Sequence, residues 1–84
     1  SVDKGETMAV KVLFFASLRE RLKKGEIKLE IDQPLTVQEI WYRSTGEALL
    51  PTNILISVNQ DYAAAETLVQ ANDEVAFFPP VTGG

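Results

Sequence analysis

The side chains of this protein offer few routes to chemistry. None of its 84 residues is a cysteine or a histidine. This excludes a thiol nucleophile, a Ser–His–Asp triad and any zinc site built from Cys and His. No disulfide can form, so the redox compartment cannot be read from cysteines. Any chemistry that the chain performs alone must therefore use carboxylates, lysines, hydroxyls or the chain termini.

The end of the sequence points to the C-terminal carboxylate. The closing residues are Pro79, Pro80, Val81, Thr82, Gly83 and Gly84. The prolines lack backbone donors and hold the chain extended as it leaves the last strand. A Gly-Gly end has no side chains, so it can enter a narrow channel and present its carboxylate to a partner's active site. A carboxylate is a poor electrophile. Joining it to AMP gives a mixed anhydride that a sulfur or nitrogen nucleophile can attack.

Charge and hydropathy narrow the possible partners. Eight basic and twelve acidic residues give a net charge of −4, and residues 43–84 hold one base and five acids. This acidic balance argues against nucleic acid and weakly favours a basic protein partner, although a solvated surface that keeps a small protein soluble is the favoured explanation. No apolar run reaches the ~20 residues of a membrane span, and no signal pattern follows Met8. We therefore expect a cytoplasmic protein that does not bind membranes.

The elements that must position the tail begin with strands. Alternation and β-branched or aromatic content predict strands over Ala9–Phe15, Glu26–Ile31, Ile54–Val58, Asp61–Ala63 and Glu74–Phe78. In the first strand, side chains alternate between the two faces of the sheet. Phe14 therefore projects from one face, and Lys11 and Phe15 project from the other. The charge of Lys11 indicates that its face meets water. The segment Glu66–Ala71 has no clear period and is expected to be irregular.

Two helices are predicted from capping patterns. Ser17–Glu20 and Thr36–Glu39 each have capping-box spacing. The first helix is short, and Gly25 can supply its left-handed terminal residue. In the second helix, one face is apolar and should pack on the sheet, so its tryptophan is expected in the core. That face contains Val37, Ile40, Trp41 and Ser44.

The order of these elements predicts an α+β fold. One main helix follows a β-hairpin and precedes further strands, which is the order of the β-grasp (ubiquitin-like) roll: a mixed sheet with one main helix packed on one face. We divide the chain into residues 1–7, a flexible extension or cloning remnant, residues 8–78, the β-grasp domain, and residues 79–84, the extended Gly-Gly tail.

An exposed aromatic patch is expected near the root of the tail. Glu74 and Phe78 share one face of the last strand, and Phe15 shares the Lys11 face of the first. If the fold places these strands side by side, Phe15 and Phe78 form an apolar patch on the surface. Tyr62 is a weaker candidate member. Such patches mark partner sites, although a phenylalanine that folds over a sheet edge would give the same pattern.

Two stretches of the sequence resemble a known family. VKVLFFASLRE (Val10–Glu20) and EVAFFPPVTGG (Glu74–Gly84), with a helix between two hairpins, are similar to the small, sulfur-carrier subunits of molybdopterin synthases. The resemblance covers Met8–Gly84, and PPVTGG is its specific motif. It departs from the family where Asn72 and Asp73 replace the usual Gly-Asp. Asparagine still permits a tight turn there.

The resemblance implies a reaction on the backbone carboxylate. A ubiquitin-activating-like adenylyltransferase would adenylate Gly84 with ATP and magnesium, and sulfide from a partner persulfide would convert the adenylate to a thiocarboxylate. The tail, residues 79–84, would then enter the large subunit of a heterotetrameric synthase, where the sulfur attacks a cyclic pyranopterin precursor in molybdenum cofactor biosynthesis. The chain would bind no cofactor or metal itself and would not be an enzyme alone.

Three other functions fit the same tail. The chain could be a sulfur carrier of another pathway, such as thiamine synthesis, or a ubiquitin-like protein modifier that forms isopeptide bonds. It could also be a β-grasp interaction domain with an inert tail. PPVTGG and the FFASLRE segment argue against the thiamine-type carrier. The modifier predicts lysine-linked conjugates.

Overall fold

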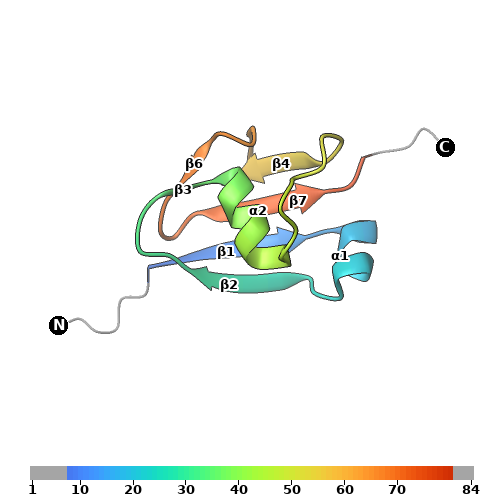
Figure 1. The fold of residues 1–84 in the computed structure, drawn as a ribbon, viewed down its shortest axis with the longest axis horizontal. Coiled ribbons are helices and arrows are strands. Elements are labelled where there is room, and N and C mark those ends of the chain that lie inside the picture. Colours follow the sequence, from blue (N-terminus) through green and yellow to red (C-terminus); the bar gives the residue numbers. More distant parts are fainter. Residues whose placement is uncertain (1–7, 81–84) are drawn as a thin grey trace.

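The computed structural model describes residues 8–80. These residues form two helices and seven strands (Figure 1). The elements are β1 (Ala9–Phe14), α1 (Ala16–Leu22), β2 (Glu26–Glu30), β3 (Leu35–Thr36), α2 (Val37–Thr45), β4 (Leu55–Val58), β5 (Asp61–Tyr62), β6 (Leu68–Val69) and β7 (Glu74–Phe78). Neither helix in this part of the chain has the length and hydropathy needed to cross a membrane.

The main sheet is mixed, as predicted. Its strand order is β2-β1-β7-β4-β5, and β3 pairs with β6 in a separate two-stranded ladder. The central strand β7 runs parallel to its neighbour β1, with Val12 opposite Val75 and Phe14 opposite Phe77. All other pairs in the main sheet are antiparallel. Helix α2 crosses one face of this sheet, and α1 lies at the end of β1 (Figure 1).

The core lies between the sheet and α2. Phe14 and Phe77 stack on each other, with centroids 5.7 Å apart, and the fully buried Trp41 meets both edge-on at 6.2 and 5.0 Å. Edge-to-face contacts between rings are favourable beyond the area that they bury. The four predicted helix residues Val37, Ile40, Trp41 and Ser44 are all buried. The prediction of a core tryptophan is therefore confirmed.

Helix α2 begins as its sequence predicts and ends at a glycine. The Thr36 side chain accepts a hydrogen bond from the backbone N–H of Glu39, and the Glu39 carboxylate accepts one from the Thr36 N–H. This reciprocal pair satisfies two donors that a helix start leaves free. Gly46 ends the helix at φ 82°, a conformation that glycine adopts without strain.

The predicted caps of α1 are wrong. The helix begins one residue before Ser17, with Phe15 as its N-cap and no side-chain cap, because the chain turns directly out of β1. Its left-handed terminal residue is Lys23 (φ 60°) instead of Gly25. A Cβ at Gly25 would lie 2.8 Å from the Arg19 guanidinium carbon, so a larger residue there would require the flexible Arg19 side chain to move.

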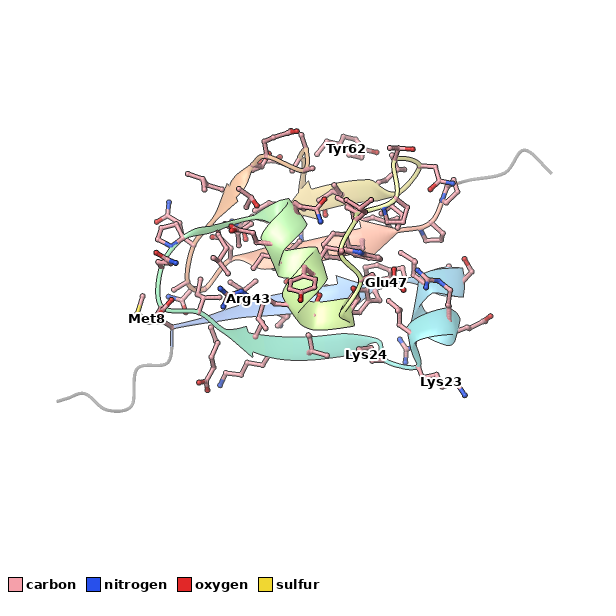
Figure 2. The ribbon with its side chains drawn as sticks, in the orientation of Figure 1. Met8, Lys23, Lys24, Arg43, Glu47 and Tyr62 are labelled. Atoms are coloured by element: carbon pink, nitrogen blue, oxygen red, sulfur yellow. The ribbon has the colours of Figure 1, made fainter. Side chains whose placement is uncertain are left out.

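An ion pair ties α1 to the segment after α2. An Arg21 guanidinium nitrogen donates to a Glu47 carboxylate oxygen at 2.6 Å. Figure 2 shows Glu47 beside α1. The hydrogen bond raises the pKa of Arg21. Both side chains remain substantially exposed, so the pair contributes little to stability.

The structure corrects the predicted strands at several points. The segment 66–71 is predicted to be irregular, but two of its residues form β6, which pairs with β3. Strands of two residues show no alternation, so the sequence carries no periodic signal for them. Three predicted strands are one residue too long at their C-terminal ends, and β4 begins at Leu55, one residue later than expected. Asn72 adopts the left-handed conformation that was expected of a tight turn (φ 76°).

We predict that Trp41→Ala lowers the free energy of unfolding by about 3–5 kcal/mol, because it leaves a cavity between α2 and the sheet. Urea titration followed by circular dichroism measures this loss. The neighbouring Tyr42 is 54% exposed on the same helix, so Tyr42→Ala should stay within about 0.5 kcal/mol of the parent. Equal shifts for the two variants would contradict the assignment of Trp41 to the core.

Candidate functional site

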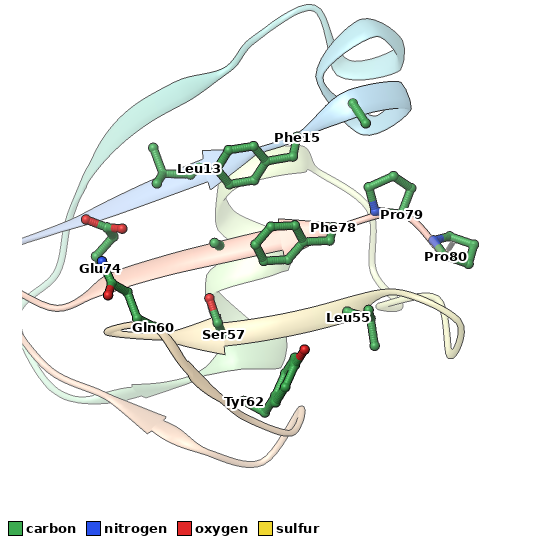
Figure 3. A pocket seen from close by; sticks show the side chains of 12 residues that line it. Leu13, Phe15, Leu55, Ser57, Gln60, Tyr62, Glu74, Phe78, Pro79 and Pro80 are labelled. Atoms are coloured by element: carbon green, nitrogen blue, oxygen red, sulfur yellow. The ribbon is translucent and has the colours of Figure 1, made fainter. Parts of the chain in front are cut away.

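The sheet face opposite α2 carries an open groove of about 680 Å³ (Figure 3). Its lining is mainly apolar and comes from β1, the start of α1, the hairpin of β4 and β5, β7 and the segment that follows β7. The lining residues are Leu13, Phe15, Ala16, Leu55, Ser57, Gln60, Tyr62, Glu74, Ala76, Phe78, Pro79 and Pro80. All three sequence-predicted patch residues, Phe15, Tyr62 and Phe78, therefore lie in one groove.

Strand alternation and register build the floor of the groove. Ala76 of β7 is paired with Leu13 of β1 on one side and with Ser57 of β4 on the other. Ser57 is in turn paired with Tyr62 of β5. Paired residues project from the same face of a sheet. This row therefore crosses four strands on the side away from the core.

Two stacked rings form the apolar centre of the groove. Phe15 and Phe78 lie with their centroids 4.8 Å apart and their planes within 3° of parallel. The backbone N–H of Phe15 donates to the Phe77 carbonyl at 3.2 Å, which extends the pairing of β1 with β7 to Phe15. Phe15 remains 40% exposed. Phe78 was expected to face water, on the same face of β7 as Glu74. It is half-buried, because Phe15 covers one side of its ring, so this expectation holds in part.

Tyr62 stands at the far side of the groove. Its side chain is 86% exposed, and Figure 3 shows it across from the phenylalanine rings. The hairpin that carries it turns at Asn59 and Gln60, both at positive φ as a type I′ turn requires. The turn is fastened to β7, since the Asn59 N–H donates to the Glu74 carbonyl at 2.7 Å and the Glu74 N–H donates to Asn59 Oδ1 at 2.9 Å.

The root of the tail lies at one end of this groove. Pro79 and Pro80 line the apolar end, and Glu74 and Gln60 mark the polar end (Figure 3). The remaining tail residues, Val81, Thr82, Gly83 and Gly84, lie outside the described residues, as does the predicted extension 1–7. The role of all these residues stays a prediction.

The groove is suited to binding and has little means of catalysis. Glu74 is its one ionisable carboxylate, and its hydroxyls belong to Ser57 and Tyr62. No hydrogen bond among the described residues joins any of these three side chains into a nucleophile–base pair. A continuous apolar surface with exposed aromatic side chains is instead typical of a protein docking site.

Sequence reasoning missed several lining residues. Leu13 follows from the face that it shares with Phe15, but Leu55 lies in a strand that is apolar on both faces, so only the register with β7 separates its outward side chain from the buried Ile56. Gln60 enters through the hairpin turn and Ala16 through a turn at positive φ. Neither has a periodic signal in the sequence.

Comparison with known proteins supports the resemblance. A sequence profile of the ThiS family matches residues 12–84 of the chain. The molybdopterin synthase sulfur carrier subunit of Haemophilus influenzae is 40% identical over 78 residues, covering 87% of this chain and 96% of the relative. The subunit of the same name from Escherichia coli is 37% identical and covers 89% and 99%, respectively.

Solved structures confirm the fold class. The small archaeal modifier protein SAMP1 from Haloferax volcanii superposes with a TM-score of 0.78 at 27% identity, covering 90% of this chain and 99% of that one. The mixed sheet, the single main helix on one face and this likeness together show the α+β β-grasp roll that the element order predicts.

Proposed function

The chain belongs to the ThiS family, and from this premise we propose that it is the sulfur-carrier subunit of a molybdopterin synthase. The observation that carries the proposal is that an apolar groove lies at the root of a tail that the family match includes. An apolar docking groove ends at Pro79 and Pro80, and the family match continues from there through Gly84. Two relatives that bear this name align over at least 96% of their own length.

In this proposal the reacting atom is on the backbone. An adenylyltransferase partner uses ATP and magnesium to form an acyl adenylate at Gly84. A partner thiol reduces a persulfide, releasing sulfide and leaving a disulfide, and the sulfide then displaces AMP to give a thiocarboxylate. The large subunit of the synthase holds the cyclic pyranopterin precursor and supplies the acid–base groups, so this chain is not an enzyme alone. Its use of a partner that consumes ATP favours a cytoplasmic site of action.

The groove and the tail act together in this mechanism. Docking of the large subunit against Phe15, Tyr62 and Phe78 would fix the point from which the tail starts. Six residues follow Phe78 and end at Gly84, and they reach at most about 22 Å when fully extended. The active site of the large subunit should therefore lie within that distance of the surface that covers the groove.

The absence of cysteine and histidine fits a carrier. The chain has no thiol that could accept sulfur from the thiocarboxylate within the same molecule. It also has no imidazole to serve as a general base in hydrolysis of the activated end. Activation and discharge would then depend on the partners alone.

A second candidate function is protein modification. It is favoured by the likeness to SAMP1, whose name describes it as a modifier protein. Transfer of activated Gly84 to a lysine amine would give isopeptide-linked conjugates, which appear as a ladder on a gel. Transfer of sulfur to a thiamine-type acceptor would be detected by reconstitution with that acceptor enzyme instead of the synthase.

Removal of Gly84 tests the sulfur-carrier proposal. We expect the chain shortened by this residue to fold and still to bind the large subunit, because the groove is intact. It should transfer no sulfur to the precursor in a reconstituted assay with the activating enzyme, ATP and a sulfur donor. Retained transfer by the shortened chain would contradict the proposal.

Two exposed large hydrophobic residues provide a matched test of docking. Tyr62 and Leu49 are 86% and 79% exposed, so neither substitution to alanine should affect folding. Only Tyr62 lines the groove. We expect Tyr62→Ala to weaken binding to the large subunit by about tenfold, as for a moderate interface hot spot, and Leu49→Ala to leave it unchanged. Calorimetric titration measures both. Equal affinities for the two variants would show that the groove is not the docking site.

A further inference from the structure

Ala16 has an unfavourable backbone conformation at a place where glycine would fit better. Its φ is 53°, in the left-handed region where a Cβ approaches the following carbonyl oxygen. Four other described non-glycine residues share a positive φ. Asn59 and Asn72 are of the type that tolerates it, and Gln60 lies in a hairpin turn that demands it. Ala16 and Lys23, at the two ends of α1, are the remaining ones.

The turn at Ala16 allows Phe15 to serve two elements at once. The Phe15 N–H donates to the Phe77 carbonyl at 3.2 Å, as a strand residue would. The Phe15 carbonyl accepts from the N–H groups of Leu18 at 3.1 Å and Arg19 at 3.4 Å, as the first acceptor of a helix does. One left-handed residue thus converts strand to helix in a single step. The Phe15 ring stays stacked on Phe78.

The side chain of Ala16 is part of the groove surface. Its methyl group lies among the lining residues, in the same groove as Phe15, Phe78 and Pro79. Glycine at this position would relieve the steric strain of the left-handed backbone. It would also remove that methyl group and make the backbone next to Phe15 more flexible. The same residue is therefore unfavourable for the backbone and useful for the surface.

We propose that Ala16 is a docking determinant that lowers the stability of the free chain. Its methyl group would contact the large subunit, and its restricted backbone would hold the Phe15 ring in the orientation that the partner receives. This inference rests on the proposed function, because it takes the large subunit of the synthase as the occupant of the groove. Strained backbone is commonly retained at sites where binding uses it.

Lys23 provides the matched control. It has a similar φ of 60° at the other end of the same helix, and it does not line the groove. Figure 2 shows Lys23 at the end of α1, at a distance from Tyr62. Ala16→Gly and Lys23→Gly should both relieve a left-handed residue, so both should raise the urea midpoint of unfolding. Lys23→Ala removes the same charge and keeps the Cβ, which isolates any effect of the charge on binding.

The experiment compares the urea midpoint with the dissociation constant for the purified large subunit from the same organism. We expect Ala16→Gly to raise the midpoint and to raise the dissociation constant about three- to fourfold, the loss for one buried methyl group. Lys23→Gly should raise the midpoint and bind as Lys23→Ala does. A merely structural role for Ala16 would move only the midpoint.

Two results would overturn the inference while leaving the proposed function intact. One is Ala16→Gly binding as tightly as the parent chain, and the other is a midpoint that falls on substitution. If the parent chain itself does not bind the large subunit, both the proposed function and this inference fail. The parent titration therefore separates the two cases.

Discussion

The parallel pairing of β1 with β7 determines both the core and the groove. Because side chains alternate along a strand, each of the neighbouring pairs Phe14–Phe15 and Phe77–Phe78 divides its rings between two faces. The inner rings pack against Trp41, and the outer rings stack on each other in the groove. A shift of one residue in this register would place the core rings in water and bury the groove rings. The hydrophobic energy of the core therefore also holds the proposed docking surface in place.

Much of this arrangement could be predicted from the sequence. The division of faces in β1 and β7 follows from their alternation, and α2 follows from the Thr36–Glu39 capping box and its apolar face. The β-grasp order then places Phe15 beside Phe78. What the sequence could not provide depends on contacts distant along the chain. The half-burial of Phe78 results from stacking by Phe15, and Leu55 becomes a groove residue only through its register with β7. The short ladder of β3 and β6 has too few residues for any periodic signal.

The start of α1 shows a different limit. Ser17 has the spacing of a capping box, yet the helix begins at Ala16 with a cap that uses the backbone alone. Local propensity was outweighed there by the pairing of Phe15 with β7, which requires the chain to leave the strand and enter the helix within one residue. No composition rule places an alanine at positive φ. Local rules tend to fail at functional sites, and this failure lies in the groove that we assign to docking.

The proposed function separates recognition from reaction. Recognition belongs to side chains on a rigid sheet, whereas the reaction belongs to a carboxylate at the end of a chain without cysteine or histidine. The claim that Gly84 carries sulfur is tested most directly by intact-mass and fragment-ion analysis of the chain. The protein should come from cells that contain the activating enzyme but lack the pterin precursor, so that the carrier is loaded and cannot discharge. The account predicts one oxygen-to-sulfur exchange, located at Gly84. A chain that ends only in the carboxylate under these conditions would contradict it.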